Sequence, residues 1–438
     1  MHKPLSIHPF PKAILHVDGD SFFVSCEIAK NPSLRGRPVI TGAERGIASA
    51  MSPEAKRAGI TRGMKISEAR HVCPTVVILP SDYETYSLVS LRMFAIVRRF
   101  TPLVEEYSID ECFADLTGLR RPLGRSYEEI GRAIQADLRS ELGMSFSVGI
   151  GPTKVLAKTG SNWKKPNGFT MIPGNRAHEF LAELPVGKIW GIGPQTSAFL
   201  TGRGITTALD LARLDEASVR RMLSKPFQEI WLELRGISAL PFSASAKPAQ
   251  SISKTKTFTP PSTSRARVFA ELSKNVENAC IKARRHGLGA RRVVVFLKQQ
   301  DFRTRGLECD LSQATNAASE ILAILAERFD ALFVPGTPYR ATGIVLGGLS
   351  DAAHIQPDLF GAALRADAWR EVNEGIDALD RRFGKHTVAL ASSMPALSRA
   401  PHASRENGKV SARAEESGRF RGETARKRVG LPSLGEVG

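Results

Sequence analysis

Short apolar runs alternate with amphipathic stretches along the first part of the chain. Residues 13–17 form a short apolar run that predicts a buried strand ending at Asp18, and a helix is expected to begin near Ser21. A helix over 83–99, a hairpin over 103–118, a helix over 126–142 and a strand over 144–151 are predicted next. This alternation favours an α/β sandwich with antiparallel strands over a parallel doubly wound fold.

Between these elements, many Gly and Pro residues interrupt residues 31–80. Short strands are expected in VIT, GIASAM and VVILP, around a basic helical piece, EAKRAGI, which together predict a small subdomain. Residues 175–240 become helical and are punctuated by Gly, and the following PFSASAKPAQS has the composition of an exposed linker. We therefore expect a domain boundary in that linker.

Beyond the linker, the pattern predicts a second compact α+β unit of ordinary domain size. Ser264 is expected to cap a helix that reaches Arg285. The other predicted elements are strands in TKTFT, RRVVVFLKQ, CDLSQ and YRATGIVLGGL and a helix over 314–331. After about Ser392 the chain is rich in Arg, Lys, Ser, Glu and Gly and poor in large apolar residues, which predicts disorder.

Composition adds information on size and charge. The 438 residues suggest about three folding units, and 42% hydrophobic and 24% charged residues are ordinary for a globular protein. A formal charge of +17 is not ordinary, and it favours a polyanionic partner, with nucleic acid the leading candidate. The alternative is a basic surface or tail without such a partner.

The cysteine pattern predicts reduced thiols. The five cysteines are odd in number, far apart and without a C-x-x-C pair, which suits a cytoplasmic protein: Cys26, Cys73, Cys112, Cys280 and Cys309. The N-terminal segment has no long apolar region, and no stretch of about 18 apolar residues follows. Neither a signal peptide nor a membrane partner is expected.

Carboxylates at the ends of predicted strands are candidate magnesium ligands. Asp18 ends one strand, its neighbour Gly19 offers a backbone carbonyl, and Asp110 and Glu111 are adjacent. In a flat strand the last two would point to opposite faces, so both reach one site only if the chain bends through Ser108 to Glu111. Mg²⁺ prefers such hard oxygen ligands. The alternative is that they are solvated turn residues, and Asp20 could simply cap the next helix.

Several segments, HVDGDSFFVSCE, EEYSIDECFADLTG, VGIGPTKVLAKTGSNWKKPNG and a Gly-rich GIG, resemble the Y family of DNA polymerases over about residues 12–361. The Phe-Phe pair is similar to DinB-type members and SPEAKRAGI to UmuC-type members. The resemblance implies a multidomain α+β, right-hand architecture with a ferredoxin-like palm and a helix-hairpin-helix in the thumb. The implied parts are the palm (12–24 and 81–174), fingers (25–80), thumb (175–241), linker (242–250), little finger (251–352), a clamp-binding peptide with a C-terminal extension (353–391) and a basic disordered tail (392–438).

The family's metal site matches four positions in this chain. Asp18, Asp110 and Glu111 match its catalytic, metal-binding acids, and Gly19 lies where the family offers a main-chain carbonyl. The implied cofactor is a pair of Mg²⁺ ions. Gly19 replaces a bulkier residue, which is expected to loosen the floor of the site.

The resemblance also implies a nucleotide site. Phe23 matches the steric gate that excludes a ribose 2′-hydroxyl, whereas Phe22 is expected mainly to pack in the core. The implied nucleotide-binding residues are Phe22, Phe23, Ser49, Ala50, Lys56 and Lys165.

Lysines supply the charge in that site. Lys165 matches the lysine that reaches the triphosphate. Pro53 and Lys56 stand where the family commonly has Tyr and Arg, which is expected to weaken nucleotide affinity. Lys154 and Lys158 are expected to face DNA or solvent.

Two further segments carry expected partners. Gly191 and Gly193 precede a helix expected to begin at Pro194, which resembles a hairpin that grips a DNA backbone; an ordinary turn between helices is the alternative. The segment RRVVVFLKQQDFRTR interleaves basic and apolar residues, as a strand along phosphates would. Gln356, Leu359 and Phe360 resemble a sliding-clamp peptide, and packing on the chain's own surface is the alternative.

The function implied is that of a monomeric, template-directed polymerase performing low-fidelity translesion synthesis. Its implied partners are primer–template DNA, dNTP and a sliding clamp. Two alternatives remain open: a catalytically inactive DNA- and clamp-binding adaptor, and a two-metal nuclease.

Overall fold

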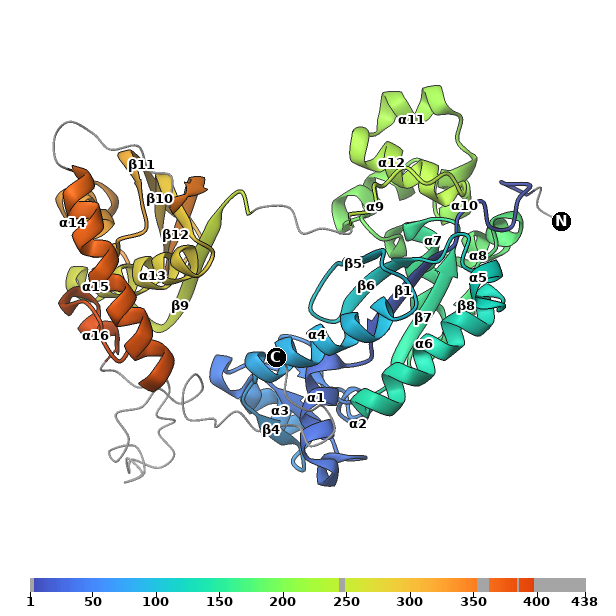
Figure 1. Ribbon diagram of the computed structural model, residues 1–438, viewed down its shortest axis with the longest axis horizontal. Coiled ribbons are helices and arrows are strands. Elements are labelled where there is room, and N and C mark those ends of the chain that lie inside the picture. The colour runs from blue at the N-terminus through green and yellow to red at the C-terminus, as the bar shows by residue number, and fades with distance from the viewer. Residues whose placement is uncertain (1–3, 244–248, 353–361, 384–385, 398–438) are drawn as a thin grey trace. The chain divides into compact units, whose positions relative to one another are not determined.

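The computed structural model describes residues 4–243, 249–352, 362–383 and 386–397. Two compact units make up this part of the chain, and the division between them falls between residues 246 and 247 (Figure 1). Each unit has its own hydrophobic core. The linker expected at residues 242–250 spans this division, and its residues 244–248 lie outside the described part.

A five-stranded sheet forms the centre of the first unit, with strand order β5-β6-β1-β7-β8. β1 pairs with β6 and β7 in antiparallel fashion, and β7 and β8 are parallel. The antiparallel pairing confirms the expected sandwich. Its strands are β1 (Ile14–Gly19), β5 (Val104–Glu106), β6 (Glu111–Asp115), β7 (Phe146–Gly151) and β8 (Phe169–Met171).

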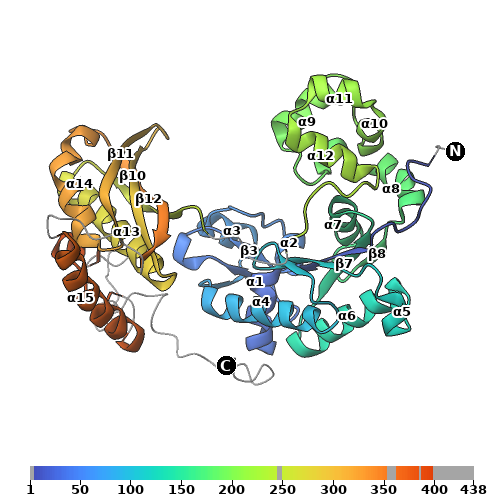
Figure 2. The same ribbon diagram turned by 45° about the horizontal axis from the view of Figure 1, so that its top comes forward.

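Helices cover both faces of this sheet (Figure 2). α4 (Tyr83–Arg98) and α6 (Tyr127–Leu142) bury their apolar residues against Leu15 and Val17 of β1. α7 (Lys154–Trp163) packs on the opposite face, where Ala157 meets Ile14 and Phe113. Because helices cover both faces of the sheet, every residue of β1 is buried.

Local signals account for where α6 begins and ends. Ser126 caps the helix in a capping box with Glu129, and Gly143 ends it in the left-handed region at φ 67°. Both positions agree with the helix predicted over 126–142. α4 likewise begins after Asp82, whose side chain accepts from Thr85 N.

A three-stranded sheet in the order β3-β2-β4 follows α1 in sequence. The strand expected in GIASAM is only two residues long, and the helix α3 was not predicted. Because Ile40, Ala55 and Ala69 share one small core, α3 forms by packing rather than by a strong local pattern. The elements are α1 (Phe22–Lys30), β2 (Val39–Thr41), β3 (Ala50–Met51), α2 (Pro53–Arg57), α3 (Ile66–Val72) and β4 (Val77–Leu79).

A helical segment completes the first unit. Its helices surround a core that includes Leu200 and Trp231 and also takes in Val155 of α7, so this segment packs on the sheet domain. α9 begins at Pro194, as the sequence predicts. The helices are α8 (Ala177–Glu183), α9 (Pro194–Thr201), α10 (Ala208–Arg213), α11 (Glu216–Met222) and α12 (Lys225–Leu234); the short helix α5 (Arg120–Leu123) lies earlier in the chain.

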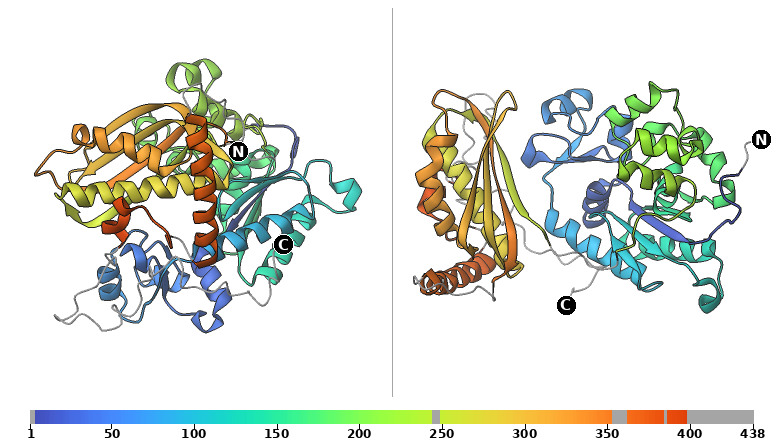
Figure 3. Two further views of the ribbon diagram at one scale, coloured as in Figure 1. Left: turned by 60° about the vertical axis from the view of Figure 1, so that its left-hand side comes forward. Right: turned by 90° about the horizontal axis from the view of Figure 1, so that it is seen from above.

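The second unit is a four-stranded antiparallel sheet in the order β11-β10-β12-β9. Figure 3 shows α13 and α14 on one side of it. Ser264 caps α13, as expected. The helix expected from residue 314 begins at Ala318, because β11 continues to Thr315. The elements are β9 (Ile252–Ser262), α13 (Arg265–Arg285), β10 (Leu288–Gln299), β11 (Thr304–Thr315), α14 (Ala318–Leu332) and β12 (Tyr339–Asp351).

Helical structure continues past this sheet. α15 (Ala362–Phe383) was not predicted, and its Asp377 accepts two hydrogen bonds from Arg284 at 2.7 and 2.8 Å. Disorder beginning at Ser392 is wrong for the first residues, because α16 (Met394–Leu397) is helical and Ser393 is buried and bonded to Ser273. Partners more than 100 residues away create this order. Residues 398–438 lie outside the described part.

The cysteine prediction agrees with the structure. All five cysteines lie in the described part of the chain, and each is buried and free of a disulfide. Among the residues that the structure describes, no helix is both long and apolar enough to cross a membrane.

Candidate active site

Asp18 and Glu111 meet at one end of the five-stranded sheet. The β1–β6 register places them directly opposite each other, so both side chains project from the face that α7 covers. Asp18 is only 5% exposed. Two carboxylates in this arrangement repel each other unless cations neutralise them.

Asp110 lies in the turn immediately before Glu111. Its carbonyl oxygen accepts from Gly19 N at 2.9 Å, and the amides of Tyr107 and Ser108 both donate to Glu111 O at 3.1 Å. The turn therefore bends the chain as expected. The Asp110 carboxylate, however, accepts from Ser108 Oγ at 2.6 Å. Within the described residues, no three His, Cys, Asp or Glu side chains are gathered closely enough to hold a metal, so only two of the three predicted acids meet.

Two lysines neutralise the acid pair. Lys165 Nζ lies 2.6 Å from Asp18 Oδ2, and Lys158 Nζ lies 2.6 Å from Glu111 Oε2. Each carboxylate of the pair therefore has one ammonium group beside it.

The expectation that Lys154 and Lys158 face DNA or solvent is wrong. They are 5% and 9% exposed, respectively. Lys154 Nζ contacts Glu105 Oε2 at 2.7 Å and donates to Pro241 O at 2.6 Å. Because α7 packs on the sheet, both ammonium groups lie over aromatic rings and also reach carboxylates on β5 and β6.

The acid pair divides its charge unequally. Burial, and to a smaller extent a hydrogen bond with Glu111, raise the pKa of Asp18 to about 7 against the pull of Lys165. Burial also opposes ionisation of Glu111, but the hydrogen bond with Asp18 and the Lys158 ammonium outweigh it and lower the pKa of Glu111. Two paired carboxylates are hard oxygen donors that fit Mg²⁺, whose binding would favour ionisation of both.

Gly19 does not loosen the floor of the site, contrary to expectation. A Cβ atom on Gly19 would lie 2.7 Å from Phe22 Cδ2 and 3.5 Å from Phe146 Cε1. The rings of Phe22 and Phe146 already fill the space that a side chain would take. Phe22 is 3% exposed, so its side chain belongs to the core, as expected.

Asp20 has a role that the sequence did not reveal. It does not cap α1, because Ser21 is the N-cap and makes no side-chain capping bond. Its carboxylate accepts from Ser147 Oγ at 2.8 Å and from Asn167 N at 2.7 Å. Asp20 therefore ties the end of β1 to the loop that carries Lys165.

Phe23 is backed by two tyrosines. Its ring stacks on Tyr86, with centroids 4.5 Å apart and an interplanar angle of 11°, and meets the edge of Tyr83 at 5.5 Å. Tyr86 is fully buried and donates to Glu27 Oε1 at 2.8 Å. Phe23 is thus a partly exposed ring on a rigid support.

The predicted nucleotide-binding residues of the small subdomain lie just before β3, on β3 and on α2. Lys56 is exposed and donates to Ser21 Oγ at 3.1 Å, so it reaches the segment that bears Phe23. Pro53 begins α2, which Ser52 caps. Ser49 N donates to Thr41 O at 2.8 Å, and Ala50 pairs with Thr41 in the sheet.

Gly191 and Gly193 are exposed at the start of α9. Gly191 has φ +92°, and a Cβ atom there would lie 2.6 Å from Ile230 Cδ1, so only glycine fits. Gly193 is the N-cap of α9 and makes no side-chain cap.

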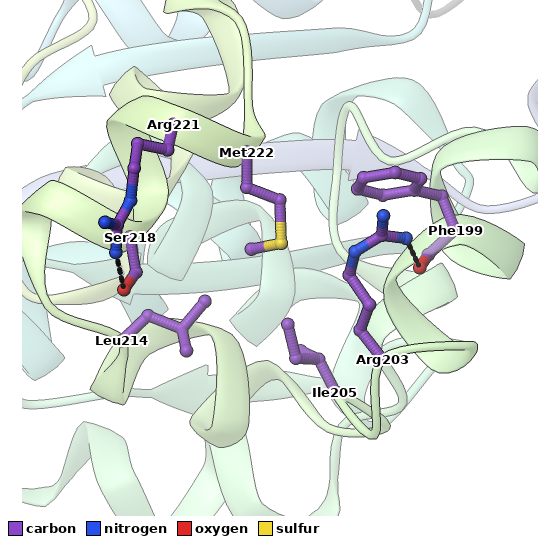
Figure 4. Close-up of a pocket in the computed structure, with 7 residues that line it drawn as sticks. All are labelled: Phe199, Arg203, Ile205, Leu214, Ser218, Arg221 and Met222. Atoms are coloured by element: carbon purple, nitrogen blue, oxygen red, sulfur yellow. Dashed lines mark hydrogen bonds between the residues drawn. The ribbon is translucent and has the colours of Figure 1, made fainter.

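A separate groove of about 510 Å³ lies on the same helical segment (Figure 4). Arg203 and Arg221 flank Met222 in it, and none of the predicted site residues lines it. The lining residues are Phe199, Arg203, Ile205, Leu214, Ser218, Arg221 and Met222.

The sequence is similar to known protein families and to characterised relatives. The impB/mucB/samB family matches residues 17–162, and its C-terminal domain matches residues 249–359. DNA polymerase IV of Desulfatibacillum aliphaticivorans is 31% identical over 382 residues, covering 86% of this chain and 96% of the relative. DNA polymerase IV of Opitutus terrae is 32% identical over 381 residues, covering 86% and 95%.

Solved structures share the fold. A Y-family DNA polymerase chimera of Dbh and Dpo4 superposes with a TM-score of 0.65 at 22% identity, covering 77% of this chain and 98% of that one. An insertion ternary complex of Dbh DNA polymerase gives 0.51 at 22% identity, covering 76% and 98%. Fold and site together define a right-hand nucleic-acid polymerase. Within that class, the chain belongs to the Y family of DNA polymerases and is DinB-like.

Proposed function

We propose that this chain extends a primer 3′-hydroxyl with dNTPs along a template and performs translesion synthesis. The observation that carries the proposal is the pairing of Asp18 with Glu111 across β1 and β6, each neutralised by a lysine at 2.6 Å. Its relatives are named DNA polymerase IV, which supports the same activity.

Asp18, Asp110 and Glu111, with the Gly19 carbonyl, would hold two Mg²⁺ ions. Bound there, the ions would assist attack by the primer oxygen and neutralise the leaving pyrophosphate. To join the metal site, the Asp110 carboxylate has to give up its hydrogen bond from the Ser108 hydroxyl. It lies next to Glu111, so rotation of its side chain is the motion required.

Lys165 would serve the triphosphate. Its ammonium group cannot keep the 2.6 Å contact with Asp18 while it binds a phosphate chain. The Lys165 side chain is 35% exposed, so it is able to move. We expect it to leave Asp18 when a divalent cation takes over the neutralisation of that carboxylate. An ammonium suits the charge that develops on the leaving phosphates.

Phe23 would exclude the ribose 2′-hydroxyl, since Tyr86 prevents the ring from retreating. Lys56, Ser49 and Ala50 would contact the incoming nucleotide from the fingers. Lys56 presents one ammonium and Pro53 presents no hydroxyl, so we expect weaker triphosphate binding than Tyr and Arg would provide.

The domain boundaries given from the sequence belong to this proposal. Separate cores for the five-stranded sheet, the three-stranded sheet and the helical segment support a palm, fingers and thumb. Residues 353–361, with Gln356, Leu359 and Phe360, lie outside the described part, and their binding to a sliding clamp stays a prediction.

DNA contacts are proposed at two places. The amino end of α9, which follows the Gly191–Gly193 hairpin and has no side-chain cap, would bind backbone phosphates. In β10, Val293, Val295 and Leu297 are buried while Arg292 is exposed on the other face, which supports the alternation expected of a strand along phosphates. Arg292 already pairs with Glu308 and Asp310, so it would have to exchange these partners.

Primer extension with Mg²⁺ and dNTPs tests the proposal. Wild type should lengthen a labelled primer, Asp110→Ala should not, and Glu106→Gln should behave as wild type because Glu106 is an exposed carboxylate paired with Arg98. DNA binding without extension would instead support the adaptor, and a shortened primer would support the nuclease.

A further inference from the structure

The two lysines beside the acid pair have different surroundings. The side chain of Lys165 is 35% exposed, whereas that of Lys158 is 11% exposed. Lys165 can therefore move into solvent, but the protein holds Lys158 beside Glu111.

Two aromatic rings hold the Lys158 ammonium. Nζ lies 5.0 Å from the Tyr107 ring centroid and 5.8 Å from that of Trp190, within the range of cation–π attraction. The rings are nearly perpendicular, at 88° with centroids 5.3 Å apart, and Trp190 Nε1 donates to Tyr107 Oη at 3.1 Å. We call Tyr107, Lys158 and Trp190 the lysine bracket.

The lysine bracket joins three segments that are distant in sequence. Tyr107 lies in the turn before Glu111 and donates its amide to Glu111 O at 3.1 Å. Lys158 lies in α7. Trp190 directly precedes Gly191 and the thumb hairpin. If that hairpin moves, Trp190 moves with it, and the contacts of Trp190 with Lys158 and of Lys158 with Glu111 would shift the Glu111 carboxylate.

We infer that Lys158 is a positioning residue for Glu111, and that Tyr107 and Trp190 fix Lys158 so that the position of the thumb hairpin is transmitted to that carboxylate. The inference rests on the proposed function, because it assigns Glu111 to the metal site. Lys158 Nζ donates to Oε2 of Glu111 at 2.6 Å and so holds that carboxylate from the side of α7. Without Lys158, the Glu111 carboxylate would lose the contact that fixes it from α7.

Lys154 is a matched control. It lies one turn earlier in α7 and is also buried. It pairs with the carboxylate of Glu105 and contacts the Phe113 ring, whereas Asp18 and Glu111 pair with Lys165 and Lys158. Lys158→Met should lower kcat for nucleotide incorporation about 10- to 100-fold, as loss of a residue that orients a metal ligand does. The KM for dNTP should change less than about twofold. Lys154→Met should lower the Tm without this selective loss of kcat.

Calcium supplies a readout that does not depend on activity. Because both carboxylates remain, Ca²⁺ should still raise the Tm of Lys158→Met. Equal loss of kcat in both lysine variants, or loss of the Ca²⁺-induced rise in Lys158→Met, would show a structural role for Lys158 and overturn the inference.

Transmission from the thumb is tested with Trp190→Leu. If Trp190 acts through Lys158, the loss of kcat in the double variant Lys158→Met/Trp190→Leu should be close to the larger single loss. A loss equal to the product of the two single losses would show independent effects and would overturn the transmission.

Trp190 also reports on Glu111 in the absence of catalysis. Its emission, taken as wild type minus Trp190→Phe, should change on adding Ca²⁺, and this response should vanish in Lys158→Met. If Ca²⁺ raises the Tm but leaves the Trp190 emission unchanged, the inferred role of the lysine bracket is wrong, although a metal site is still present. No effect of Ca²⁺ on Tm or emission overturns the metal site itself, and with it the proposed function.

Discussion

Gly19→Ala would introduce one methyl group into a crowded contact beside the acid pair. The new Cβ would lie 2.7 Å from Phe22 Cδ2, whereas carbon atoms in ordinary contact are about 3.5–4.0 Å apart. The Phe22 ring would therefore have to move by roughly 1 Å, and it is 3% exposed within a packed core. Overpacking of this kind costs about 1–3 kcal/mol, so we expect the free energy of unfolding to fall by that amount.

The same displacement should affect selectivity. Phe22 and Phe23 are consecutive in α1, and their ring centroids are 6.1 Å apart, so a shift of Phe22 would move the proposed gate. Gly19→Ala should therefore also lower the ratio of kcat/KM for dNTP to that for the ribonucleotide. Denaturant unfolding and single-nucleotide incorporation measure the two effects.

The variant Phe22→Leu tests whether crowding against Phe22 causes the effect of Gly19→Ala. A smaller side chain at position 22 would make room for the methyl group, so Gly19→Ala should cost clearly less in that background. The crowding argument fails if Gly19→Ala leaves the free energy of unfolding unchanged, or if its cost is the same in both backgrounds.

Further predictions concern the nucleotide and the clamp. Phe23→Ala should weaken discrimination against ribonucleotides roughly 10- to 200-fold, and unchanged discrimination in incorporation assays would remove the gate assignment. Lys165→Met should raise the KM for dNTP about tenfold, equivalent to about 1.4 kcal/mol, while primer–template affinity in a gel shift stays the same. Deleting residues 356–360 should reduce clamp-stimulated synthesis and spare basal extension, and equal loss of both would indicate a packing role.

Local patterns in the sequence were enough to place many elements and some of the site. The helix at 126–142, the caps Ser126 and Ser264, and the start of α9 at Pro194 follow from signals within a few residues. The position of Asp18 at a strand end follows in the same way. The resemblance to a family then supplied the roles of residues such as Phe23, which periodicity alone could not assign.

Only the tertiary structure decided the contacts around that site. Lys158 and Glu111 are 47 positions apart, and Asp20 and Asn167 are 147 apart, so no local signal links them. Lysines are usually exposed, and Lys154 and Lys158 are buried only because α7 packs on the sheet beside carboxylates of β5 and β6. Likewise, Gly19 is crowded because Phe22 and Phe146 converge on it. A sequence determines elements through neighbouring residues, whereas the environment of each side chain depends on which distant surfaces those elements cover.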